Sequence, residues 1–131
     1  MAEVIAKNLM PKLAITSMGV AATNGSPASE NARRTVACRG LSLASHKSKI
    51  IDPKLLSGAK LVLTMTRSHM SFVKSLCKGA NAFTLADYAG RGGDISDPFG
   101  ADIKIYQECA AEIESLITYC VEKIVDIANQ D

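Results

Sequence analysis

Short apolar runs alternate with helical patterns along this chain, and that alternation constrains the fold more than any other feature. Residues 13–20 and 60–66 are apolar runs bounded by turn or charged residues, which is typical of strands buried on both faces, and residues 82–85 are a weaker third candidate. Helical patterns cover residues 1–10, 29–39, 52–58, 68–78 and a long stretch that begins at Asp102. The order predicts an α/β fold of three layers, with an open parallel sheet flanked by helices.

The size and composition fit one globular domain that spans residues 1–131. Apolar residues make up 47% of the chain and charged residues 21%, which excludes a disordered chain. No apolar run reaches the roughly 20 residues of a membrane span, and residues 1–10 lack the pattern of a signal peptide, so we expect a cytoplasmic protein with no membrane partner. The net charge is only +2 and no basic stripe is interleaved with aromatic residues, so we expect no nucleic-acid partner.

Cys38, Cys77, Cys109 and Cys120 show neither a C-x-x-C pair nor the spacing of a zinc site. Each lies in a segment that looks helical and partly buried, so we interpret all four as reduced structural thiols. We expect no metal and no organic cofactor.

The glycine-rich segment 88–100 is the most informative stretch for function, because long loops next to a rigid scaffold often carry functional residues. Within it, Asp97 precedes Pro98, which favours an extended backbone at Asp97 and gives its carboxylate a set direction. Phe99 could form one wall of a cleft. By spacing alone, a turn aspartate and a core phenylalanine explain the same residues.

Five groups of motifs, in order along almost the whole chain, resemble the low-molecular-weight protein tyrosine phosphatase family. They are Ser17-Met18-Gly19; Gly25-Ser26-Pro27 with Asn31-Ala32-Arg33-Arg34-Thr35-Val36; Gly40-Leu41 with Ser45-His46-Lys47; Ala59-Lys60-Leu61-Val62-Leu63-Thr64-Met65-Thr66; and Gly93-Asp94-Ile95-Ser96-Asp97-Pro98-Phe99-Gly100.

The resemblance implies a two-step phosphoryl transfer on a phosphorylated protein or a small phosphate substrate. A cysteine thiolate in a C-x5-R-[ST] loop attacks phosphorus, and an aspartate in an Asp-Pro loop protonates the leaving group and then deprotonates water. By motif match, Asp97 is the catalytic acid and base, and Phe99 flanks the substrate. Ser17 and His46 match the residues that brace the phosphate loop; without the resemblance they are a strand serine and an exposed loop histidine.

The chain departs from the family because it carries no C-x5-R motif. The residues six positions after the four cysteines are Ala44, Phe83, Ser115 and Asp126. We therefore expect a truncated domain that lacks the first central strand and the phosphate loop, and that is inactive alone. Such a sheet would have a gap, so we expect re-pairing of the flanking strands, self-association that inserts a segment from a second chain, or a loosened N-terminal half.

Three functions remain open. The first is a protein phosphatase in its full-length form. Here Gly93-Asp94 and the single aromatic residue after Asp97 look closer to the family's protein arginine phosphatase branch than to its tyrosine phosphatases. The second is a thiol-linked arsenate reductase, which shares the fold but needs two further redox cysteines where only Cys77 is near. The third is a non-enzymatic remnant that binds a partner.

Overall fold

A computed structural model describes residues 1–20 and 22–130 of the chain. The chain divides into two compact units. The first consists of Met1–Ile51 with Asp97–Ser115, and the second of Asp52–Ser96 with Leu116–Asp131. The single domain expected for residues 1–131 stays a prediction.

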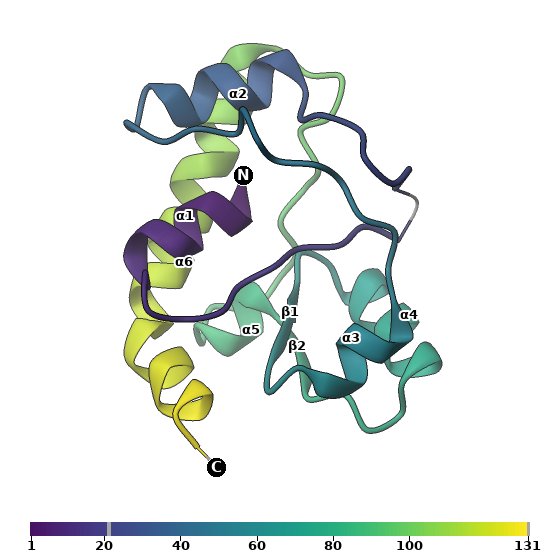
Figure 1. The fold of residues 1–131 in the computed structure, drawn as a ribbon. Helices are drawn as coiled ribbons and strands as arrows, with labels where there is room; N and C mark the ends of the chain where they lie inside the picture. Colours follow the sequence, from purple (N-terminus) through teal and green to yellow (C-terminus); the bar gives the residue numbers. More distant parts are fainter. Residues whose placement is uncertain (21, 131) are drawn as a thin grey trace. The chain divides into compact units, whose positions relative to one another are not determined.

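The first unit contains α1 (Ala2–Leu9), α2 (Glu30–Ala37) and the first half of α6 (Ile103–Ala128) (Figure 1). Two predicted helix starts are correct: the Ser29 side chain accepts a hydrogen bond from Ala32 N–H, and the Asp102 carboxylate accepts one from Ile105 N–H. Caps of this kind satisfy amide groups that the helix leaves without a partner. The core of this unit is a cluster around Ala32, Val36, Leu43 and Tyr106, against which Met1 and Val4 pack.

The prediction of a strand at residues 13–20 is wrong, because these residues form no ladder of hydrogen bonds with a neighbouring strand. Residues 12–18 carry no regular structure, and pairing is limited to one parallel bridge between Gly19 and Ile50. Ala14 and Thr16 are exposed while Leu13 and Ile15 are partly buried, so the segment is covered on one face rather than on both. An extended segment becomes a strand only where a neighbour takes its backbone hydrogen bonds, and a sequence run does not supply that neighbour.

The second unit contains α3 (Pro53–Gly58), β1 (Val62–Thr64), α4 (Arg67–Leu76), β2 (Ala82–Thr84), α5 (Leu85–Tyr88) and the second half of α6. β1 and β2 pair in parallel, with Val62 opposite Ala82 and Thr64 opposite Thr84. Helix α4 connects the two strands and contacts both of them, as a parallel crossover requires (Figure 1). The predicted alternation of parallel strands and helices is therefore present in this unit.

Two features of the second unit were not predicted. Tyr88 was assigned to the loop but is the last residue of α5, a helix of one turn whose start is capped by the Thr84 hydroxyl, which accepts a hydrogen bond from Asp87 N–H. Helix α6 is interrupted at Cys120, where φ is −117° and ψ is 16°. Nowhere in residues 1–20 and 22–130 is there a helix with the length and apolar content to cross a membrane.

Candidate functional site

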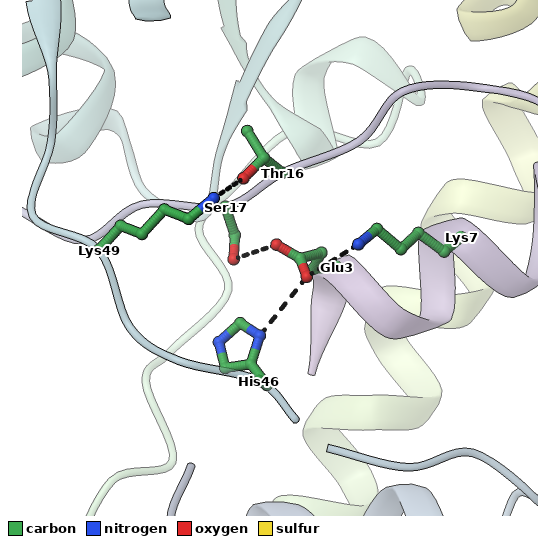
Figure 2. A network of polar contacts seen from close by, with 6 residues as sticks. All are labelled: Glu3, Lys7, Thr16, Ser17, His46 and Lys49. Carbon is green, nitrogen blue, oxygen red and sulfur yellow. Dashed lines mark hydrogen bonds and ion pairs between the residues drawn. The ribbon is translucent and has the colours of Figure 1, made fainter. Parts of the chain in front are cut away.

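Three side chains converge on the carboxylate of Glu3, in the first turn of α1 (Figure 2). The Ser17 hydroxyl donates a hydrogen bond to Oε1 at 2.9 Å. On the other oxygen, Lys7 Nζ lies 3.2 Å from Oε2 and His46 Nδ1 lies 3.5 Å from it. Ser17 and His46, which are 29 positions apart in the sequence, are thus brought together by one carboxylate, and we call these four residues the Glu3 cluster.

The local chain explains why His46 reaches the Glu3 cluster. Leu43 is only 3% exposed and belongs to the core of the first unit, so it anchors the loop that follows α2. His46 N–H donates to the Leu43 carbonyl at 3.1 Å, which closes a turn and holds the backbone of His46 beside this anchor. Ser17 and His46 were predicted from the sequence, but Glu3 was not. The signal that could have identified Glu3 is its position as an acidic residue in the first turn of a helix.

The surroundings of Glu3 favour its charged form. Burial by itself would raise the pKa of this carboxyl, but hydrogen bonds from Ser17 and Lys7 and the charges of Lys7 and His46 outweigh burial and lower the pKa below its ordinary value. Burial also lowers the pKa of the Met1 amino group, although Glu3 and Cys109 act in the opposite direction. Burial and neighbouring groups therefore shift the pKa values of both the Met1 amino group and the Glu3 carboxyl at the start of α1.

Asp97 and Phe99 lie on an exposed loop of the same unit. Asp97 Oδ1 accepts a hydrogen bond from Phe99 N–H at 3.0 Å, which directs the carboxylate back over its own loop. The end of this loop is held to α2, because Asn31 Nδ2 donates to the Ala101 carbonyl at 3.2 Å. Phe99 is 81% exposed, so the alternative of a core phenylalanine is wrong.

The charges of Asp97 and of the Met1 amino group act on the Cys109 thiol in opposite directions. Burial raises the pKa of Cys109, the carboxylates of Glu112 and Asp97 raise it further, and the Met1 ammonium opposes them. Among the described residues, neither Asp97 nor Phe99 forms a hydrogen bond or ion pair with Ser17 or His46.

Cys109 and Cys120 lack the environment of an activated nucleophile. Burial raises the pKa of Cys109 and of Cys120, which disfavours the reactive thiolate. Cys38 is exposed just after α2, so the prediction that all four cysteines are partly buried is wrong for this residue. In the part of the chain that the structure describes, no three side chains of His, Cys, Asp or Glu gather as a metal site would require.

Comparison with known sequences identifies relatives along nearly the whole chain. The pattern described as low molecular weight phosphotyrosine protein phosphatase matches residues 1–128. A protein-arginine-phosphatase of Geobacillus stearothermophilus is 32% identical over 126 residues, which are 94% of this chain and 84% of the relative. The low molecular weight protein-tyrosine-phosphatase PtpB of Staphylococcus epidermidis is 30% identical over 125 residues, covering 89% of this chain and 84% of that relative.

Solved structures give the same result. The YwlE arginine phosphatase from Geobacillus stearothermophilus superposes with a TM-score of 0.88 at 32% identity, over 95% of this chain and 83% of that one. A low molecular weight protein tyrosine phosphatase from T. tengcongensis gives a TM-score of 0.86 at 32% identity, over 93% and 88% of the two chains. The predicted α/β fold is thereby confirmed. The chain belongs to the low molecular weight phosphotyrosine protein phosphatase family, a family of protein phosphatases.

Proposed function

We propose that this protein acts on phosphorylated protein side chains, with phosphoarginine as the preferred substrate and phosphotyrosine as the alternative. The arginine branch is favoured because two relatives carry the name protein-arginine-phosphatase and because Phe99 is the single aromatic residue of the motif Asp97-Pro98-Phe99-Gly100. The observation that carries the proposal is the meeting of Ser17 and His46 on Glu3, since these two residues match the family's bracing positions. We place the reaction in the cytoplasm, where reduced thiols persist.

Asp97 is the catalytic acid and base in this proposal. Its Oδ1 is occupied by Phe99 N–H, whereas its Oδ2 has no hydrogen bond among the described residues and is available to carry the proton. In the first step Oδ2 protonates the leaving nitrogen or oxygen, and in the second it takes a proton from the attacking water. A positioned acid of this kind contributes about 10² to 10⁴ in rate. Phe99, exposed beside it, supplies an apolar wall for the substrate side chain.

Ser17 and His46 are positioning residues. Both are held by the Glu3 carboxylate, so their orientations do not depend on the substrate. The imidazole turns Nδ1 toward Glu3, which leaves Nε2 as the atom that can hydrogen-bond to a phosphate-binding loop. A brace of this kind raises activity by holding the loop, not by touching the reacting atoms.

Residues 1–131 contain no C-x5-R motif, and we propose that the polypeptide of these residues alone does not turn over phosphate esters. The raised pKa values of Cys109 and Cys120 support this, because neither thiol is poised to substitute as nucleophile. Catalysis then requires a C-x5-R-[ST] loop at the start of α1, where helix amides can hold the phosphate.

Self-association is also part of the proposal. The backbone groups of Ala14, Ile15, Thr16 and Ser17 make no hydrogen bond with any described residue. An extended segment with free backbone groups is a ready template for a strand of another chain. A concentration-dependent dimer in analytical ultracentrifugation would support this part, and a monomer at all concentrations would contradict it.

The catalytic proposal is tested with a fusion that places a strand and loop carrying the family's C-x5-R-[ST] motif before Met1. The polypeptide of residues 1–131 and the fusion are assayed side by side on 4-nitrophenyl phosphate, a phosphoarginine peptide and a phosphotyrosine peptide. We expect activity from the fusion alone, and a loss of about 10² to 10⁴ in kcat when Asp97 is replaced by Asn. A fully active Asp97→Asn fusion would contradict the assignment of the acid.

The substrate proposal has a separate readout in the same assay. A higher kcat/KM for the phosphoarginine peptide than for the phosphotyrosine peptide supports the arginine branch. The reverse order assigns the protein to the tyrosine phosphatases and leaves the role of Asp97 intact.

A further inference from the structure

A pocket of about 560 Å³ opens beside the Glu3 cluster, between α1, residues 15–16 and the loop 42–49 of the same unit. This volume lies in the range of about 300 to 1,000 Å³ that is usual for small-ligand sites. Asp97 and Phe99 do not line it. The pocket therefore excludes the proposed acid and its flanking aromatic residue, but it shares Glu3, Lys7 and His46 with the Glu3 cluster.

The lining of this pocket is rich in cations and hydroxyl groups. It is lined by Lys7, Lys47 and Lys49 and by the hydroxyl residues Thr16, Ser42 and Ser45. All three lysines are exposed, so their ammonium groups reach the opening without a desolvation cost. Ammonium and hydroxyl groups are donors, and several of them around one cavity suit a ligand made of acceptor oxygens.

The carboxylate in the lining does not cancel this charge. Glu3 is already bound by Ser17, Lys7 and His46, so its negative charge is taken up inside the Glu3 cluster. Two cations remain. Lys49 Nζ donates at 2.8 Å to the neutral hydroxyl of Thr16, as Figure 2 shows, and Lys47 forms no ion pair with any described residue.

We propose that this pocket binds a phosphate group, as a second anion site beside the candidate catalytic residues. Lysine binds phosphate as a point charge, and clefts lined by one sign of charge concentrate anions of the other sign. In the site, Lys47 and Lys49 face the phosphate oxygens, and the hydroxyls of Ser42 and Ser45 donate to them. The phosphate is carried either by a small molecule or by a second phosphorylated side chain of a protein substrate.

The test is a titration of the ¹⁵N-labelled polypeptide of residues 1–131, followed by amide chemical shifts at low ionic strength. The probes are inorganic phosphate, free phosphoarginine and a phosphoarginine peptide, with sodium chloride at matched ionic strength as the blank. We expect saturable shifts in residues 42–49 and at Lys7, and an affinity that falls as salt is added. Saturation by the peptide alone identifies a protein-borne phosphate, and saturation by all three probes identifies the phosphate group itself.

The deciding variant is Lys47→Gln combined with Lys49→Gln, for which we expect binding about tenfold weaker or more, because two charges near the ligand are lost. Lys12→Gln is the matched control, since Lys12 is exposed in the same unit and does not line the pocket. The proposal is overturned if no probe gives saturable shifts, if chloride reproduces them, or if the double variant binds as tightly as Lys12→Gln. Binding is measured without turnover, so this result is independent of the catalytic proposal.

Discussion

Replacing Glu3 by Gln should destabilise the protein by about 1.5 to 2.5 kcal/mol at pH 7, because it removes the charge while keeping the shape of the side chain. Glu3 is 13% exposed and receives three donors, which makes it the most heavily contacted carboxylate of the described residues. The Gln side chain can still accept from Ser17, but it can no longer pair with Lys7 or with a protonated His46.

The magnitude follows from the contacts. A hydrogen bond to a charged acceptor contributes about 1 kcal/mol more than one to a neutral acceptor, which applies to the 2.9 Å bond from Ser17. The pair with Lys7 contributes only about 0.3 to 0.5 kcal/mol, because the Lys7 side chain is 51% exposed and the pair is screened. A carboxylate in the first turn of α1 adds about 0.3 to 1 kcal/mol through the helix dipole.

The pH dependence has a definite sign. The folded protein lowers the pKa of Glu3 below its ordinary value of 4.5, so the folded state favours the carboxylate. The advantage of the natural protein over Glu3→Gln is therefore full above pH 4.5 and is lost as the pH falls through the lowered folded-state pKa. Urea unfolding followed by circular dichroism between pH 7 and pH 3.5 should show the two midpoints converging in acid.

Glu30→Gln is the matched control for this experiment. Glu30 is an exposed acid in the first turn of α2, so it shares the helix position of Glu3 but not its three donors. We expect it to cost only the dipole contribution, about 0.5 kcal/mol at pH 7. The reasoning is refuted if the two variants are equally destabilised, or if the gap between the natural protein and Glu3→Gln stays constant down to pH 3.5.

Three further predictions concern other parts of the chain. Phe99→Ala should leave the unfolding midpoint unchanged, because the ring is 81% exposed, and should raise KM more than it lowers kcat in the active fusion. Ser29→Ala should cost about 0.5 to 2 kcal/mol in urea unfolding, since its hydroxyl accepts from Ala32 N–H and caps α2. Lys123→Met should cost about 0.5 to 1 kcal/mol, because Lys123 Nζ lies 4.0 Å from the centre of the Tyr88 ring; no change in the midpoint would exclude a stabilising contact there.

The helices could be predicted from the sequence because their signals are local. Ser29, Asp52 and Asp102 cap α2, α3 and α6 at the predicted starts, and a period of 3.6 residues marks the apolar face of α6. The break at Cys120 was not predicted, because no local pattern marks it. Helix α5 did leave one signal, a threonine three residues before an aspartate, which is a capping pattern.

The candidate site was predicted in part, and the misses share a cause. Ser17 and His46 were identified by motif, but Glu3 was not, because its role depends on a chain reversal that brings residues 3, 17 and 46 together. The run 13–20 has the composition of a strand, yet a strand is a property of a pair of segments. Functional residues that belong to a local motif can be predicted from the sequence, whereas contacts between residues far apart in the chain become known only from the fold.

The Glu3 cluster links the two sites that this structure suggests. Lys7 and His46 both contact the Glu3 carboxylate, and both line the pocket of about 560 Å³ that is proposed to bind phosphate. If a phosphate in the proposed site also draws Lys7 away, the Glu3 carboxylate is left with Ser17 and His46 alone. Because coupling between sites is reciprocal, whatever changes the hold of Glu3 on His46 must also change the affinity of the pocket. The proposed phosphate site therefore predicts that occupancy of the pocket is coupled to the bracing of the phosphate loop.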